Sequence, residues 1–451
     1  MARKLIGAIG AVLMVVTAFA TAASGAAPGG SAEPHGASER GHPPLRPVVF
    51  VHGASGSGAQ FETQALRLAG NGYPTDRIAV HEYDSTFATN TMADVWAGLD
   101  ELIATLRTET GADKVDLLGH SLGTFVSQGY LTSSPERAAT VAHYVNIDGR
   151  PAVAPPGGVP TLAVWGEGAP SRQVVGATNW YASDQSHVQV ATSAETFAEF
   201  YEFLTGRPPR TTAVVPERGR IRISGEANLF PANIGAAGTT LEVWKVDGRT
   251  GDRRGRHPVA SFAVGEDGAW GPFRASRHQS YELALTRADG SVHHFYVRPF
   301  VRSDHLVRLL TSEPGTGIDL LRDKSDAHTS LTITRYKELW GDQGAAGDVL
   351  TVDGHDVVTP ALAPRAERIN ALFVFDDGSD GVTDLSAPIP DVSALPFISG
   401  ADLHLPAASP PDDTITVALR SRTGSGRTQV VNVPNWASSQ HHVSIHFPDF
   451  A

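Results

Sequence analysis

The chain has 451 residues, no cysteine, and 48 acidic against 36 basic residues, giving a formal net charge of −12. Its length predicts more than one domain, and its 41% hydrophobic and 19% charged residues exclude a chain that is disordered throughout. The missing cysteines exclude disulfides, thiol catalysis and iron–sulfur clusters, and the acidic balance gives no electrostatic reason to expect nucleic acid as a partner.

The N-terminus predicts export from the cell. Arg3 and Lys4 precede an uncharged run at 5–22 that ends in small residues, which is the pattern of a signal peptide. We therefore expect residues 1–22 to be removed and the protein to be secreted. A membrane anchor is the alternative, but no basic stop-transfer cluster follows the run. Residues 23–45 are rich in Ala, Gly, Pro and Ser and predict a flexible linker.

The next segment, residues 46–210, predicts a domain of alternating strands and helices. Short apolar runs typical of buried strands alternate with stretches whose apolar residues recur at helical spacing; the strands are expected at 48–51, 78–83 and 115–118, and the helices at 91–110 and 194–204. Such an alternation predicts a mainly parallel sheet that helices cover on both faces.

The remainder of the chain predicts β structure. Apolar and polar residues alternate in twos at 241–246, 330–336 and 413–420, and Asp-Gly turns are frequent. We expect a β-sandwich at 215–300 and a second β unit at 301–451. The predicted fold class is therefore an α/β domain followed by an all-β C-terminal region.

A candidate nucleophile lies between a predicted strand and a predicted helix. Ser121 is the centre of Gly119-His120-Ser121-Leu122-Gly123, which precedes a helical stretch at 124–131. This is the context of a nucleophile elbow, in which a strained turn lifts the serine hydroxyl out of the sheet and the glycines avoid collisions with the backbone. An ordinary glycine-rich turn is the alternative, and the strand-to-helix context favours the nucleophile.

A serine nucleophile needs a base, and the base needs an acid to orient it. His187 follows a candidate strand at 177–181 and is the expected base. Asp148 and Glu167 compete as the acid, since each follows or ends a strand. We favour Asp148, because an aspartate at the end of a strand can face the histidine, whereas the turn after Glu167 is expected to carry that side chain into solvent.

The first strand ends in His52-Gly53-Ala54, where a backbone amide can complete an oxyanion hole. The amides of Ala54 and Leu122 are the predicted donors. A structural and a functional role for His52 are equally compatible with its position. The Gly/Ser-rich stretch at 55–58 lacks the Lys of a phosphate-binding loop, which disfavours a nucleotide.

No cofactor is expected. Residues 376–384 offer clustered oxygen ligands similar to a calcium loop, but Gly378 stands at a ligand position and no Glu closes the loop, so a polar hairpin turn is favoured. His442 and His446 lie on one predicted strand about 13 Å apart, too far to share a zinc ion. We predict no metal site.

Several motifs run along nearly the whole mature chain, among them Val48-Val49-Phe50-Val51-His52-Gly53, Gly111 to Leu117, the elbow, Ser134 to Ala139, His187-Val188-Gln189 and Arg335-Tyr336-Lys337-Glu338. In these residues the sequence resembles an archaeal-type long-chain lipase/carboxylesterase family. The resemblance implies an α/β-hydrolase domain joined to a C-terminal β-barrel that binds lipid acyl chains, with Ser121 as nucleophile, Asp148 as acid and His187 as base.

One departure from that family concerns the lid. The family carries a helical lid insertion before the helix that leads to the elbow, but here only residues 84–113 separate the second strand from the third. The lid is expected to be missing or reduced to a loop, and with it the interfacial activation that a lid supports.

Together these features predict a secreted serine hydrolase, a lipase or carboxylesterase, that cleaves carboxylic esters of lipid or other acyl substrates through an acyl-enzyme. A short-chain ester or polyester hydrolase with an open site remains an alternative. From another class, a catalytically inactive protein that binds lipid or polysaccharide is also possible, although the complete Ser, Asp and His set argues against it. Transient contact with a lipid surface would be apolar and made by the β half. The sequence leaves the oligomeric state open.

Overall fold

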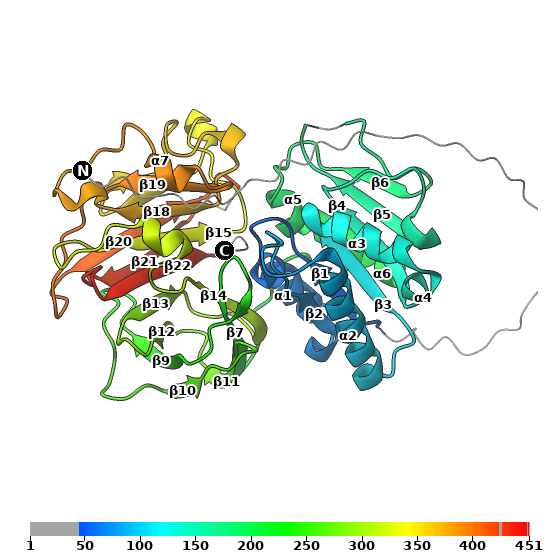
Figure 1. Ribbon diagram of the computed structural model, residues 1–451, viewed down its shortest axis with the longest axis horizontal. Coiled ribbons are helices and arrows are strands. Elements are labelled where there is room, and N and C mark those ends of the chain that lie inside the picture. Colours follow the sequence, from blue (N-terminus) through cyan, green and yellow to red (C-terminus); the bar gives the residue numbers. More distant parts are fainter. Residues whose placement is uncertain (1–44, 169, 424–425, 449, 451) are drawn as a thin grey trace, which may run out of the picture. The chain divides into compact units, whose positions relative to one another are not determined.

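Six parallel strands form the sheet of the first domain (Figure 1). In the computed structural model, which describes residues 45–168, 170–423, 426–448 and 450, the strands follow the order β2-β1-β3-β4-β5-β6. Their bounds are β1 Val48–Val51, β2 Ile78–His81, β3 Val115–His120, β4 Val141–Ile147, β5 Thr161–Trp165 and β6 Thr178–Tyr181. Every neighbouring pair in this sheet is parallel. The predicted signal peptide at 1–22 and the linker at 23–45, apart from Leu45, lie outside the described residues.

Helices cover both faces of this sheet. The bounds are α1 Glu62–Gly70, α2 Met92–Thr110, α3 Leu122–Ser133, α4 Pro135–Ala139, α5 Gln189–Thr192 and α6 Ala194–Thr205. Side chains of α1 and α6 pack in one apolar core with the sheet, and side chains of α2, α3 and α4 pack in another. The predicted α/β-hydrolase arrangement, with helices on both faces of a parallel sheet, is confirmed.

The segment between β2 and β3 is short. Within residues 82–114, all of which the structure describes, a loop at 82–91 leads directly into α2, which a capping box of Thr91 and Asp94 begins and Gly111 in the left-handed conformation ends. Thus α2 is the only α-helix in this described segment, and no helical lid is inserted there.

The described residues of the C-terminal region form mainly strands, with one short α-helix, α7 Pro390–Ser393. Its largest sheet has the order β10-β9-β12-β13-β22-β15-β18-β19. The bounds are β9 Thr240–Val246, β10 Ala260–Ala263, β12 Ser280–Thr286, β13 Val292–Val297, β15 Leu331–Arg335, β18 Ala371–Phe375, β19 Ile398–Asp402 and β22 His441–Phe447. The predicted all-β C-terminal region is confirmed.

Two smaller sheets accompany the eight-stranded sheet. One contains β7 Ile221–Leu229, β8 Ile234–Gly235, β11 Ala269–Ala275 and β14 Asp304–Thr311, and the other contains β16 Val349–Val352, β17 His355–Asp356, β20 Thr414–Arg420 and β21 Thr428–Pro434. The first packs a core against β9, β12 and β13, and the second packs a core against β15, β18 and β22. On β13, Phe295 belongs to the first core and Tyr296 to the second. Because successive side chains of a strand point to opposite faces, the two small sheets lie on opposite faces of the large one.

The eight-stranded sheet joins the two β units that the sequence predicts. β13, from the predicted sandwich at 215–300, pairs with β22, and β14, from the predicted unit at 301–451, pairs with β7. The division at residue 300 therefore does not separate two independent sheets. Residues 45–451 form one compact unit.

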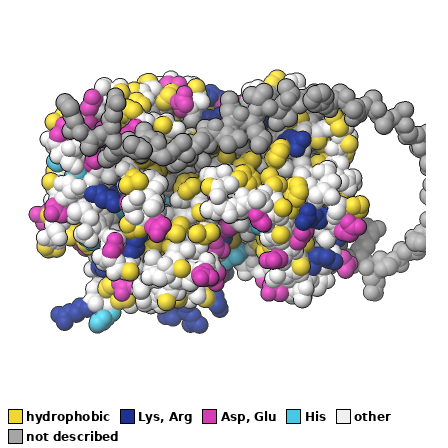
Figure 2. Space-filling view, viewed as in Figure 1, with side chains coloured by type: hydrophobic (Ala, Val, Ile, Leu, Met, Phe, Trp, Pro, Cys, Tyr) yellow, Lys and Arg dark blue, Asp and Glu magenta, His cyan; other side chains and the backbone are white. Residues whose placement is uncertain are grey.

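Among the described residues, none of the helices is both long and apolar enough to cross a membrane. On the face seen in Figure 2, basic and acidic side chains are interspersed among apolar ones instead of gathering by sign.

Candidate active site

Ser121 occupies a strained turn between β3 and α3. Its φ of 54° and ψ of −120° lie outside the regions that a residue with a side chain ordinarily adopts. The flanking glycines allow the turn: a Cβ on Gly119 would lie 2.6 Å from the Gly123 carbonyl oxygen, and a Cβ on Gly123 would lie 2.2 Å from the Val51 carbonyl oxygen. Both distances are shorter than any tolerable contact, so this turn requires glycine at both positions.

The structure brings Ser121, His187 and Asp148 together in one chain of hydrogen bonds. Ser121 Oγ lies 2.9 Å from His187 Nε2, and His187 Nδ1 lies 2.6 Å from Asp148 Oδ2. Ser121 follows β3 and Asp148 follows β4, and carboxyl ends of parallel strands meet at one edge of a sheet. With a proton on Nδ1 toward the carboxylate, Nε2 is left as an acceptor for the serine hydroxyl.

Asp148 is held as a carboxylate. Its side chain is 4% exposed, and besides His187 it accepts hydrogen bonds from the Gly166 amide at 3.0 Å and from Arg172 Nη2 at 2.6 Å. Burial alone would raise the pKa of Asp148, but the hydrogen bonds from His187 and Gly166 and the nearby positive charges lower it to about 2. Arg172, which carries one of those charges, was not expected from the sequence, because nothing near it in sequence indicates that it reaches Asp148.

The competing acid, Glu167, lies elsewhere. Its carboxylate forms an ion pair with Arg365 of the C-terminal region, and its side chain is 23% exposed. We expected the turn after β5 to carry Glu167 into solvent, and this expectation is wrong in part. The side chain points away from the site, but it pairs with Arg365 instead of lying free in solvent.

The histidine of the elbow, His120, supports the His187 loop. His120 Nε2 lies 2.9 Å from the His187 carbonyl oxygen, and its Nδ1 lies 2.6 Å from Gln60 Nε2. Burial lowers the pKa of His120 to about 3, so the ring is neutral at physiological pH. The Gln60 amide donates to Nδ1, which leaves the proton on Nε2 to donate to the His187 carbonyl.

The backbone segments that carry the predicted oxyanion donors both lie near Ser121. Leu122 is the first residue of α3, directly after Ser121, and Ala54 lines the same cavity as Ser121 and His187. Gly53 approaches so closely that a Cβ there would lie 3.0 Å from Ser121 Cβ. The backbone after β1 is thereby held against the elbow, which is where an oxyanion donor is needed.

His52 has a structural position. Its ring is fully buried and stacks on Tyr83 with 4.3 Å between ring centroids, and the Tyr83 hydroxyl donates to the His52 carbonyl at 2.8 Å. Burial lowers the pKa of His52 to about 4.

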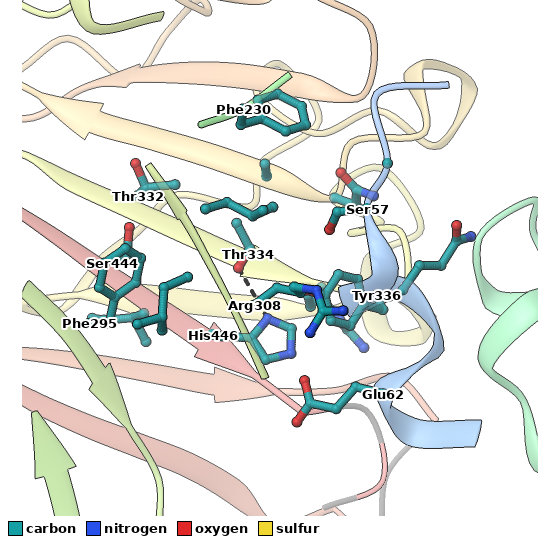
Figure 3. A pocket seen from close by; sticks show the side chains of 18 of the residues that line it. Ser57, Glu62, Phe230, Phe295, Arg308, Thr332, Thr334, Tyr336, Ser444 and His446 are labelled. Carbon is teal, nitrogen blue, oxygen red and sulfur yellow. Dashed lines mark hydrogen bonds between the residues drawn. The ribbon is translucent and has the colours of Figure 1, made fainter. Parts of the chain in front are cut away.

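A cavity of about 320 Å³ opens from the candidate site into the C-terminal region. Its lining includes Ser121 and His187 on the first domain and a row of side chains that crosses four paired strands of the eight-stranded sheet: Phe295, Ser444, Thr332 and Phe373. Figure 3 shows Phe295, Ser444 and Thr332 on these strands, with Ser57 on the segment after β1 and Glu62 at the start of α1. Residues adjacent in sequence on β15 and β22, such as Ile333 and Val443, belong instead to the core on the opposite face. On β15 and β22, one face therefore packs in that core, and the other face lines the cavity.

No group of three or more His, Asp or Glu side chains that could hold a metal ion occurs in the part of the chain that the structure describes. In the loop at 376–384, the Asp376 carboxylate accepts hydrogen bonds from His404 Nδ1 at 2.7 Å and from the Asp380 and Gly381 amides. These contacts occupy the oxygens of the first residue of the loop.

Comparison with known families confirms the resemblance that the motifs predict. Residues 45–134 match the class 2 lipase family, residues 219–314 match the lipase C-terminal domain, and residues 317–451 match a further C-terminal domain family. The match to the lipase C-terminal domain ends after β14. It therefore includes both β14 and β7, which pair in one sheet. No curated protein matches the sequence significantly.

Solved structures similar to part of the chain include several hydrolases. Another similar structure is a gene product of Listeria innocua, with 14% identity, a TM-score of 0.28 and coverage of 37% of this chain and 97% of that one. Lipase B of Aspergillus fumigatus has 13% identity and a TM-score of 0.30, with 37% of this chain and 54% of that one covered. A CIB-like hydrolase of Thermoplasma acidophilum has 14% identity and a TM-score of 0.26, with 36% and 87% covered.

Proposed function

We propose that this chain, which carries regions matching the class 2 lipase and lipase C-terminal families, cleaves carboxylic esters of fatty-acyl type through a Ser121–His187–Asp148 triad. The observation that carries the proposal is the pair of hydrogen bonds, 2.9 Å and 2.6 Å long, that links the three side chains beside a cavity. Nucleophile, acid and base lie on segments that follow β3, β4 and β6 of one parallel sheet.

The proposed reaction has two halves. Ser121 Oγ attacks the ester carbonyl while His187 Nε2 takes the hydroxyl proton, and the Asp148 carboxylate stabilises the imidazolium. The amides of Ala54 and Leu122 hold the negative charge on the carbonyl oxygen. The tetrahedral intermediate collapses, and the departing alcohol takes the proton from His187. Water then gives a proton to His187 and attacks the carbonyl of the acyl-enzyme. The second tetrahedral intermediate collapses as His187 gives that proton to the departing Ser121 Oγ, which releases the acid and restores the enzyme.

For the acyl chain we propose the cavity that extends along the eight-stranded sheet. Its lining includes the aromatic side chains Phe230, Phe295, Phe300, Phe373 and Phe397. A volume of about 320 Å³ is within the range of pockets that bury a small molecule. A cavity with this aromatic lining favours a fatty-acyl ester over a polymer surface as substrate.

Replacement of the nucleophile tests the proposed reaction. Ser121→Ala removes the attacking oxygen, so hydrolysis of nitrophenyl esters should fall at least about a thousandfold while the fold is retained. Steady-state rates and circular dichroism measure the two effects. Undiminished turnover in the folded variant would exclude Ser121 as the nucleophile.

The acid assignment has a matched pair of variants. Asp148→Ala removes the partner of His187, whereas Glu167→Ala removes a side chain that pairs with Arg365. We expect kcat to fall at least about a hundredfold in the first variant and to stay within about twofold in the second. Loss of activity in Glu167→Ala alone would reverse the assignment.

The acyl-binding role of the cavity is tested by filling it. Leu310 lines the cavity and is half-buried, so Leu310→Trp should lower kcat/KM for long-chain nitrophenyl esters about tenfold or more while short-chain esters are spared. Leu320→Trp is the control, because Leu320 is 59% exposed. An equal loss for short and long chains in Leu310→Trp would contradict acyl binding in this cavity.

We also propose that the protein is secreted after cleavage near Ala22, on the basis of the signal-like run at 5–22. Contact with a lipid surface, if the substrate is aggregated, would be transient and apolar. Mass spectrometry of the N-terminus of protein from the culture medium tests the cleavage, and recovery of an intact N-terminus from the cell pellet alone would argue against it.

A further inference from the structure

Glu338, in the C-terminal region, contacts the loop that carries His187. Its side chain is fully buried and accepts hydrogen bonds from three groups of that loop. Ser186 Oγ donates to Oε2 at 2.5 Å, the Val188 amide donates to Oε1 at 2.6 Å, and the Gln189 amide donates to Oε2 at 3.1 Å. The donors lie on both sides of His187 in sequence, so one carboxylate holds the backbone before and after it.

A carboxylate is suited to this position because it only accepts hydrogen bonds and has two oxygens to do so. The Val188 and Gln189 amides stand at the start of α5, where a helix offers no partner of its own. Buried amides without an acceptor cost free energy, so the loop is stable in this conformation only while an acceptor is present. The acceptor comes from a residue about 150 positions later in the chain.

Neighbouring contacts hold Glu338 and the loop in the same relation. Arg422 donates to the Glu338 carbonyl oxygen and, through Nη2, to Gln189 Oε1 at 2.8 Å. Thr192 Oγ1, at the end of α5, donates to the Tyr336 carbonyl at 2.8 Å. The loop is therefore attached to the C-terminal region at several points.

The other side of the loop is held by the first domain, where His120 contacts the His187 carbonyl at 2.9 Å. The imidazole itself is held at 2.6 Å by Asp148. Displacement of the loop would therefore change the distance from His187 Nε2 to Ser121 Oγ, because the ring is carried on the backbone that Glu338 fixes.

We propose that Glu338 is a positioning residue for His187, so that the C-terminal region completes the active site as well as lining the cavity. The inference rests on the proposed triad function. Glu338 touches no reacting atom; it acts by fixing the backbone on which the base is mounted.

The test is Glu338→Gln in the full chain. The amide keeps the size of the side chain but places an NH2 group against the loop donors, so one side of His187 loses its acceptor. We expect kcat for a short-chain nitrophenyl ester to fall about tenfold to a hundredfold with KM little changed, because a small misplacement of a catalytic group has an effect of this size. The proton between His187 and Asp148 should also broaden or shift in the downfield proton NMR spectrum.

Glu282→Gln is the matched control. Glu282 is an equally buried carboxylate of the C-terminal region, but its partners are Arg253 at 2.7 Å and His294 at 2.6 Å. Both variants should lower the midpoint of thermal unfolding, whereas only Glu338→Gln should lower kcat in the folded protein and alter the downfield proton.

The outcomes separate the two proposals. If wild-type activity requires Ser121 but Glu338→Gln keeps the wild-type kcat and NMR signal, Glu338 is structural and the inference is wrong. If Ser121→Ala is fully active, the proposed function itself fails. Should Glu338→Gln not fold, Ser186→Ala removes one of the three donors and is expected to lower kcat severalfold; an unchanged kcat there overturns the inference.

Discussion

At Asp148, the backbone and the side chain are fixed by different neighbours. The residue has a φ of 42°, in the left-handed region, and its amide donates to the Val164 carbonyl at 2.7 Å. Its carboxylate faces His187, Gly166 and Arg172. The parallel pairing of β4 with β5 thus fixes the position of the Asp148 backbone, and the three donors fix the orientation of its carboxylate.

The low pKa of Asp148 predicts a pH dependence of stability. A carboxyl group whose pKa falls from 3.8 to about 2 on folding contributes stability that is complete above about pH 4 and is lost as the pH falls toward 2. Between these pH values the wild type should lose about 2 kcal/mol more of its free energy of unfolding than Asp148→Asn, whose side chain does not titrate. Urea unfolding of both proteins at several pH values measures the difference. Parallel pH curves would contradict the ionised, hydrogen-bonded carboxylate.

Residues adjacent to strands in sequence could be predicted, and residues that act from a distance could not. Ser121 and Asp148 follow apolar strands whose ends must meet in a parallel sheet, so their side chains are brought together by local pattern alone. Gln60, Arg172 and Glu338 reach the site through the packing of loops, and no periodicity or motif around them indicates a partner. The run Arg335 to Glu338 marked a resemblance without indicating a role.

At the scale of elements, the elbow depends on the close approach of α3 to β1. Gly123 lies in the first turn of α3, and a Cβ there would lie 2.2 Å from the Val51 carbonyl and 2.6 Å from the His52 carbonyl. Backbone atoms of a buried strand cannot move aside as a flexible side chain can, so the helix itself would have to shift.

Gly123→Ala is therefore expected to lower the free energy of unfolding by about 3 kcal/mol or more, the cost of overpacking against fixed backbone. Gly248→Ala is the control, since a Cβ there would meet only Ser280 Oγ at 3.3 Å, and it should change stability by about 1 kcal/mol at most. Chemical unfolding of both variants measures the two changes in the free energy of unfolding. Equal stability of the two would show that α3 can move away from β1.

The elements themselves follow from local sequence, whereas their pairing does not. The expected helix at 91–110 is α2, and the alternating runs at 241–246, 330–336 and 413–420 correspond to β9, β15 and β20. The alternation of apolar and polar residues indicates that one face of a strand is buried, but it does not indicate which strand pairs with it. The insertion of β22 between β13 and β15 joins segments far apart in the chain, and no short-range pattern encodes it.

At the scale of the whole molecule, buried charges contribute to the junction between the first domain and the C-terminal region. Arg308 of β14 is 3% exposed on its side chain and pairs with Glu82 at 2.7 Å and with Glu226 at 3.0 Å. Glu82 follows β2 in the first domain, and Glu226 lies on β7. One guanidinium thus joins a carboxylate from each part.

Removing Arg308 should destabilise the molecule strongly. In Arg308→Met two carboxylates lose their shared partner, and the free energy of unfolding should fall by about 3–5 kcal/mol. Arg254→Met breaks a pair with Asp247 whose arginine is 58% exposed, and the expected loss is below about 1 kcal/mol. Urea unfolding of the wild type and both variants measures these two losses of free energy. A small effect at Arg308 would mean that water or another cation replaces the guanidinium.

The central place of β22 has a consequence for the timing of folding. His441–Phe447 is the last strand of the described chain, yet it hydrogen-bonds to β13 on one side and to β15 on the other. The large sheet therefore cannot close until β22 itself has been synthesised. During refolding, protection of the β22 amides from hydrogen exchange should appear no later than the proposed ester hydrolysis. A chain that has not yet reached β22 has neither a closed central sheet nor the cavity wall formed by Ser444 and His446, so newly made protein lacks this cavity until β22 is in place.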